Sequence, residues 1–228
     1  MDKLAAILIA VHSIADFYLQ TGGLVQKKSK PGFLILHAAI HAVLVYVVLQ
    51  AWSCWQAPLF VLLVHALIDF SKQKKGKDTA TAFMMDQTIH ILSLLILAWL
   101  MIRFSWVPAF AGVGFKPLVA AAGFIATVQG AGLLVNKFVK RLMDENKLEL
   151  DGLINGGKLI GQLERTLIFV FVFIGQPAGI GFLVAAKSIL RFEEAKKQKM
   201  AEYVLIGTLL SFSLAIALAF ITKWAMKL

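Results

Sequence analysis

The segment VHSIADFYLQ, residues 11–20, lies in the first apolar run of the chain, yet it carries a histidine and an aspartate four positions apart. Residues 64–73 read VHALIDFSKQ, which is identical to the first segment at five of ten positions. Ionisable side chains are costly in an apolar, membrane-like setting, and by default they mark a functional site there. The sequence therefore predicts a duplicated apolar helix that carries a functional His/Asp pair in each copy.

The whole chain is more apolar than a soluble domain. Its 228 residues are 59% hydrophobic, with a mean hydropathy of +0.79, whereas roughly half of the residues of a soluble protein are apolar. The net charge of +10 comes from basic residues in short clusters between apolar runs, as is typical of juxtamembrane lysines. We therefore expect membrane lipid, and no nucleic acid, as the partner of this protein.

Seven apolar segments are long enough to cross, or nearly cross, about 30 Å of hydrocarbon. An eighth, 178–192, is shorter and carries Lys187. The seven longer segments are 4–20, 33–51, 57–71, 82–104, 117–136, 159–175 and 202–222. This pattern predicts an all-α polytopic membrane helix bundle with seven or eight transmembrane helices.

The loops predict the orientation of the bundle. If all eight segments cross, sixteen Lys and Arg residues lie on one side of the membrane and five on the other. Basic loops stay in the cytoplasm. The loops with sixteen basic residues are therefore expected to face the cytoplasm.

The histidines divide the chain into two parts. All five lie before residue 105, and the later helices carry Glu164, Arg165 and Lys187 instead. We predict a single membrane domain in which residues 1–104 form a pseudo-symmetric four-helix core, built from a repeated helical hairpin. Residues 105–228 form the C-terminal helices.

Four pairs with i, i+4 spacing contain every histidine of the chain. The pairs are His12/Asp16, His37/His41, His65/Asp69 and Asp86/His90. Residues four apart lie on one face of a helix. At 1.5 Å per residue, counted from the predicted cytoplasmic helix ends, all four pairs share a layer roughly 3 to 12 Å deep. The spacing therefore predicts eight ligand-type side chains at one level of the membrane.

Imidazole and carboxylate ligands without a thiolate suit zinc, manganese or iron, and we favour zinc. One zinc ion takes three or four protein ligands. Eight candidates indicate either two ions about 3.5–4 Å apart or one ion with orienting carboxylates around it. Asp16, Asp69 and Asp86 are predicted to ligate the metal or to act as a base. The alternative is a hydrogen-bonded network that only holds the bundle together.

The second part of the chain offers a candidate anion-binding site. Arg165, Lys187 and Arg191, with Glu164 beside them, could hold a phosphate or a carboxylate near the metal. The alternative is that these long cations extend to the membrane interface while Glu164 neutralises a neighbour.

The motifs resemble those of a bacterial integral-membrane family, domain of unknown function 3307. They are HSIADFYLQ, HAAIHAVL, HALIDF, DQTIH, GGKLIGQLERTLIF, GIGFLVAAKSILRF and AEYVLIGTLLSF. The resemblance implies a multi-pass protein of the bacterial inner membrane. It singles out the eight His/Asp residues together with Glu164, Arg165, Lys187 and Arg191, and it implies no activity.

Three functions fit these residues. The first is a membrane-embedded, metal-dependent hydrolase of a lipid or another anionic amphiphile, in which the metal activates a water molecule. The second is a metal-ion or proton-coupled transporter, since His/Asp chains also line ion pathways. The third is a non-catalytic sensor or scaffold with a structural metal. The apolar stretches beyond the ligand layer, such as LAAILIAV and AVLVYVVL, argue against a transport path.

Overall fold

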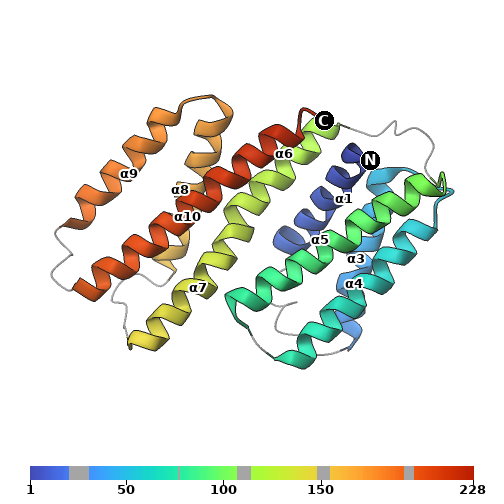
Figure 1. Ribbon diagram of the computed structural model, residues 1–228, viewed down its shortest axis with the longest axis horizontal. Coiled ribbons are helices and arrows are strands. Elements are labelled where there is room, and N and C mark those ends of the chain that lie inside the picture. Colours follow the sequence, from blue (N-terminus) through green and yellow to red (C-terminus); the bar gives the residue numbers. More distant parts are fainter. Residues whose placement is uncertain (21–30, 77, 107–113, 148–154, 193–197) are drawn as a thin grey trace. The chain divides into compact units, whose positions relative to one another are not determined.

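The computed structural model describes residues 1–20, 31–76, 78–106, 114–147, 155–192 and 198–228, and this part of the chain is helical without any strand (Figure 1). The predicted all-α class is confirmed. The helices are α1 (Asp2–Ile14), η1 (Ala15–Leu19), α3 (Pro31–Leu49), α4 (Gln56–Lys75), α5 (Ala80–Arg103), α6 (Phe115–Ile125), η2 (Ala126–Gly130), α7 (Ala131–Asn146), α8 (Gly156–Phe173), α9 (Pro177–Phe192) and α10 (Gln198–Ala225).

Four of these helices are long and apolar enough to cross a membrane, which indicates a membrane protein. They cover Pro31–Leu49, Ala80–Arg103, Phe115–Asn146 and Ala201–Ala225. The third combines α6, η2 and α7 and runs ten residues beyond the predicted segment 117–136. Seven or eight crossings, and the pseudo-symmetry of the core, stay predictions.

The described chain forms two compact units. The first contains Met1–Ile125 and Ala225–Leu228, and the second contains Ala126–Trp224. Because α6 packs against α1, the first unit continues past residue 104.

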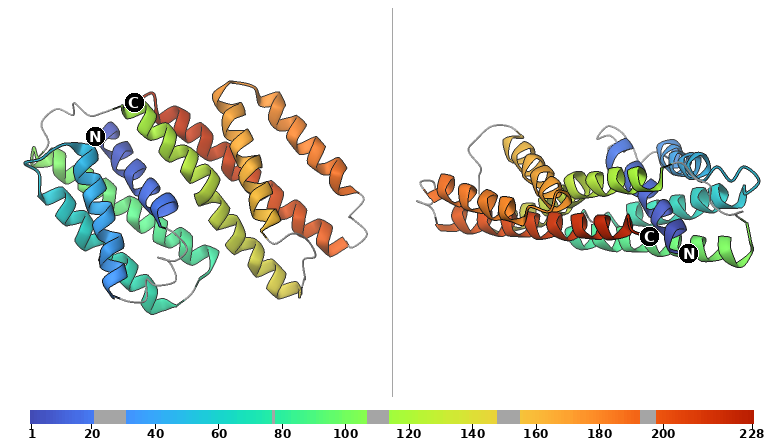
Figure 2. Two further views of the ribbon diagram at one scale, coloured as in Figure 1. Left: turned by 180° about the vertical axis from the view of Figure 1, so that it is seen from behind. Right: turned by 90° about the horizontal axis from the view of Figure 1, so that it is seen from above.

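The first unit is built from antiparallel neighbours, with α3 packed on α4 and α4 on α5, while α1 contacts α3, α5 and α6 (Figure 2). Local sequence sets the turns. Helix α4 is followed by Gly76 as its C-cap, which has a left-handed φ of 60°, a conformation that glycine adopts without steric cost. Helix α5 is preceded by Thr79 as its N-cap, whose hydroxyl accepts a hydrogen bond from the Ala82 amide at 3.1 Å.

Helix α4 shows how the first unit is oriented toward its surroundings. Leu63 and Leu67 are more than 60% exposed, while His65 and Asp69 are each only 4% exposed. A soluble protein would bury the two leucines and expose the histidine and the aspartate. The apolar outer face and the ionisable inner face suit a helix that lies in lipid.

The second unit has its own apolar core. Helices α8, α9 and α10 meet around two small clusters: Ile168, Phe212 and Ala215 in one, and Phe169, Val172 and Ala219 in the other. The core fixes the faces of α8 and α10, and it thereby places Arg165 and Ser211 opposite each other.

Candidate metal centre

Five helical segments of the first unit bring the predicted ligands together. His12 lies on α1 and Asp16 on η1, and the other three pairs lie on α3, α4 and α5. All five histidines, Asp69 and Asp86 are buried, and the side chain of Asp16 is 10% exposed. The i, i+4 spacing has therefore placed all eight side chains inside one bundle.

The imidazole rings form a continuous cluster with His65 in the middle. The centroid of its ring lies 3.8 Å from that of His41, 4.3 Å from His90 and 5.0 Å from His37. The ring of His12 is stacked on that of His90 at 5.0 Å. Several protonated imidazoles at these distances would repel one another strongly in a buried site. The cluster is thus arranged for neutral imidazoles, the form that binds metal ions.

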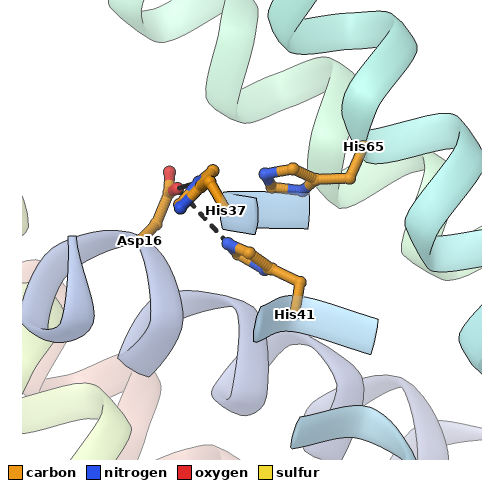
Figure 3. Close-up of side chains that lie close together, drawn as sticks. All are labelled: Asp16, His37, His41 and His65. Carbon is orange, nitrogen blue, oxygen red and sulfur yellow. Dashed lines mark hydrogen bonds and ion pairs between the residues drawn. The ribbon is translucent and has the colours of Figure 1, made fainter. Parts of the chain in front are cut away.

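One group of four side chains offers ligand atoms that all lie within 4.8 Å of one another: Asp16, His37, His41 and His65 (Figure 3). The Oδ1 atom of Asp16 lies 3.1 Å from Nε2 of His37 and 3.6 Å from Nε2 of His41. Three imidazoles and one carboxylate are a ligand set that zinc takes readily.

A second group shares His65 with the first and adds Asp69 and His90. The Nδ1 atom of His90 lies 2.9 Å from the backbone carbonyl oxygen of Asp86. A carbonyl can only accept, so Nδ1 carries the proton and Nε2 presents its lone pair to the cluster. This fixed tautomer prepares His90 to act as a ligand.

Three imidazole nitrogens of the cluster are buried without a hydrogen-bond partner in the part of the chain that the structure describes. They are the Nε2 atoms of His41, His65 and His90. Buried polar atoms without a partner are rare and costly, and an ion is one of the few groups that resolve them. A divalent ion bound by these nitrogens would supply the missing interaction, so the residues fit a metal.

The two copies of the repeat differ in backbone. Asp16 lies in the π-helix η1, where the Gln20 amide donates to the carbonyl of Ala15 at 3.1 Å, whereas the corresponding Asp69 lies in the regular helix α4. Single π-helical turns are frequent at functional sites. Here the turn carries the carboxylate that contacts both histidines of α3.

Two further residues belong to the cluster and were missed by the sequence analysis. The Nε2 atom of Gln87 donates to Oδ2 of Asp16 at 2.8 Å, and its Oε1 lies 3.4 Å from Nε2 of His12. The ammonium of Lys72 forms an ion pair with Oδ2 of Asp86 at 2.7 Å. Their positions offered a signal, because Gln87 follows Asp86 directly and Lys72 lies three residues after Asp69.

The cluster has a polar end and an apolar end. At the polar end, Asp69 and Lys72 lie near the end of α4, Asp16 lies in η1, and Asp86 and Gln87 lie near the start of α5. The side chain of Lys72 is 38% exposed there. On the opposite side, His12, His41, His65 and His90 line a pocket with room for about one water molecule, whose other walls are mostly apolar. These walls include Leu8, Val45, Val61 and Leu94, which are buried in the core of the first unit.

The predicted anion-binding residues belong to the second unit. The ammonium of Lys187 lies 2.7 Å from Oε1 of Glu164. The guanidinium of Arg165 donates to the Val128 carbonyl at 3.0 Å and to the Ser211 hydroxyl at 3.1 Å. Arg191 lies on α9, and its side chain is outside the described residues. Both described cations thus have protein partners, and an anion-binding role stays a prediction.

The fold and this cluster together define an all-helical protein with membrane-type helices and a buried His/Asp site able to hold a metal ion. Residues 4–111 match the family model described as "Protein of unknown function (DUF3307)". The resemblance predicted from the sequence is confirmed over this range, which is just under half of the chain. The match contains all eight predicted ligands. No curated protein and no solved structure matches the chain.

Proposed function

We propose that this protein is a membrane-embedded, metal-dependent hydrolase of an amphiphilic substrate, with zinc as the favoured metal and manganese or iron as alternatives. The observation that carries the proposal is that the Nε2 atoms of His41, His65 and His90 are buried without a hydrogen bond among the described residues, close to the carboxylates of Asp16 and Asp69. Neutral imidazoles and carboxylates are the usual ligands of catalytic zinc.

A divalent ion held by such ligands lowers the pKa of a bound water molecule toward neutrality and polarises an acyl or phosphoryl oxygen. The residues of the chain supply the rest of the chemistry. The histidines fix the ion, and a carboxylate, Asp16 or Asp69, accepts the proton that the attacking water loses. The new bond joins the water oxygen to the carbonyl carbon or to phosphorus. The bond to the leaving oxygen breaks, and that oxygen receives the proton.

The polar end of the cluster supports an amphiphilic substrate. Lys72 is partly exposed there beside buried ligands, and large apolar side chains such as Leu67 face outward on the same helix. An anionic head group would meet the basic end while its apolar chain stays in the membrane. We expect the substrate to approach from the leaflet on the side of the basic loops, which we assign to the cytoplasmic side of the bacterial inner membrane.

The apolar end of the cluster favours hydrolysis over transport. Beyond the histidines the first unit continues with buried Leu8, Val45, Val61 and Leu94. An ion path needs polar groups or water along its length. A structural metal in a sensor or scaffold would leave the exposed, basic entrance at Lys72 without a role.

The test is product release by purified, zinc-loaded protein from vesicles of bacterial phospholipid labelled in the acyl chains and in the phosphate. We expect His65→Gln and Asp69→Asn to abolish the release that the wild type shows. Thr88→Val, an exposed position on α5, is the matched control and should retain it. If the zinc-loaded wild type releases no product but carries zinc across the membrane of proteoliposomes, the result would contradict the hydrolase and support a transporter.

A further inference from the structure

The ion pair between Lys72 and Asp86 places a positively charged side chain of the protein next to the metal cluster. Its two atoms lie 2.7 Å apart, and the side chain of Asp86 is only 4% exposed. Asp86 is also the one predicted carboxylate that lies outside both groups of potential metal ligands. One carboxylate of the site is thus already occupied by an ammonium group.

Lys72 belongs to the same face of α4 as the ligands. His65, Asp69 and Lys72 are spaced four and three residues apart, which places them along one stripe of the helix. Because the stripe leads from the exposed end toward the centre of the cluster, the flexible stem of Lys72 directs its charge inward. The ammonium lies where a second metal ion would meet Asp86.

We infer that Lys72 acts as the built-in second cation of the site, so that the cluster binds one divalent ion rather than two. The inference rests on the proposed metal site and deepens it. In this role, Lys72 would lie next to the anionic group of the substrate, at the position that a second metal ion would otherwise occupy.

Electrostatic repulsion supports one ion. A second divalent ion bound by Asp86 would lie beside the ammonium of Lys72, which is 2.7 Å from Oδ2 of that carboxylate. Like charges at such distances repel strongly in a buried site, so a second divalent ion is disfavoured while Lys72 is in place.

Gln87 connects the two cation positions. Its Nε2 donates to Oδ2 of Asp16 at 2.8 Å and lies 3.5 Å from Oδ2 of Asp86, the oxygen that pairs with Lys72. The amide therefore holds the metal-group carboxylate and the Lys72-bound carboxylate at a fixed spacing. The Oδ1 atom of Asp86 is buried without a hydrogen-bond partner among the described residues. Asp86 is therefore ready to bind an ion when the ammonium is removed.

The experiment counts zinc per chain in purified full-length protein equilibrated with buffered zinc. We expect one zinc in the wild type, one in Lys72→Arg, which keeps the charge, and two in Lys72→Met. The double variant Lys72→Met/Asp86→Asn should return to one, because it removes the carboxylate that the second ion needs. Lys74→Met is the matched control, since Lys74 lies over the ring of Phe70 at 4.6 Å, and it should stay at one.

Two results would overturn the role of Lys72 and leave the metal site intact: two zinc ions in the wild type, or one in Lys72→Met. A second ion that persists in the double variant would also overturn it, because that ion would not depend on Asp86. Wild type without bound zinc, manganese or iron would instead refute the proposed function itself.

Discussion

Gln87 is the neutral side chain that joins separate carboxylates and imidazoles of the cluster. It contacts Asp16 from η1 and His12 from α1, although it is carried by α5. Groups that hold metal ligands in this way fix their orientation and raise their affinity for the ion. The position of Asp16 therefore depends on an amide some seventy residues away in sequence.

Replacing Gln87 by leucine should weaken zinc binding by about 10- to 100-fold, because Asp16 and His12 lose the group that orients them. Competition with a chelating dye on purified protein measures the change. Thr88→Val, on the exposed side of the same helix, is the control and should leave the affinity unchanged. Equal affinities of Gln87→Leu and the wild type would show that the amide does not hold the site.

The sequence predicts which His and Asp side chains come together, but it does not predict the residues that pair with them. The i, i+4 spacing is a property of one helix, so it correctly brings His65 and Asp69 to the same face. The pairing of Lys72 with Asp86 depends on how α4 and α5 are rotated about their axes, which no local pattern specifies. Lys72 therefore looked like an ordinary residue of a basic loop.

At the level of helices, the second unit is organised around a buried arginine. Arg165 on α8 donates to the Val128 carbonyl in the π-helix η2 and to Ser211 on α10. Gly132 on α7 and Gly161 on α8 give the guanidinium the room it needs, because a Cβ atom at these positions would lie 2.5 Å from Nη2 and 3.0 Å from Nη1. Arg165 thus joins three helical segments of this unit.

Substituting Gly132 by alanine should lower the free energy of unfolding by about 1–3 kcal/mol, the usual cost of an added methyl group in a tightly packed site. The guanidinium cannot move aside without losing its bonds to Val128 and Ser211. Thermal unfolding in detergent measures the effect.

Gly181→Ala on α9 is the matched control, because its new methyl group meets no atom within 4 Å. Alanine is the better helix former by about 1 kcal/mol, so this variant should be as stable as the wild type or slightly more stable. A Gly132→Ala variant as stable as Gly181→Ala would contradict the role given to Arg165.

The positions of the helices follow from the lengths of the apolar runs. Each of the eight predicted segments coincides with helical structure, and four of them, 4–20, 33–51, 82–104 and 159–175, run one or two residues past the helix end. The π-helical turns η1 and η2 do not follow, because ADFYL and ATVQG carry no residue that distinguishes π-helix from α-helix. The prolongation of α7 to Asn146 was also missed. Its last turns are charged, and only the apolar part of this helix was counted as a membrane segment.

For the molecule as a whole, we expect the basic loops to lie on one side of a membrane and the other loops on the opposite side. Ser71 near the end of α4 and Ser105 after α5 lie at opposite ends of this arrangement, and both are exposed. They can therefore report the orientation of the first unit.

Cysteine labelling tests this orientation on a background in which the single native cysteine, Cys54, is replaced by serine. We expect a membrane-impermeant maleimide to label Ser105→Cys in intact spheroplasts and to label Ser71→Cys only after permeabilisation, because basic loops stay in the cytoplasm. Labelling of Ser71→Cys from outside would reverse the orientation and move the entrance of the site to the other leaflet.

The most direct test of the central claim is X-ray absorption at the zinc edge of purified, zinc-loaded protein. We expect the zinc to be surrounded by imidazole nitrogens and carboxylate oxygens at about 2.0–2.2 Å, without sulfur. In His65→Gln, the same spectrum should lose imidazole scattering, because His65 belongs to both ligand groups. A wild-type spectrum of fully hydrated zinc, or one that His65→Gln leaves unchanged, would contradict a metal centre in the His/Asp cluster.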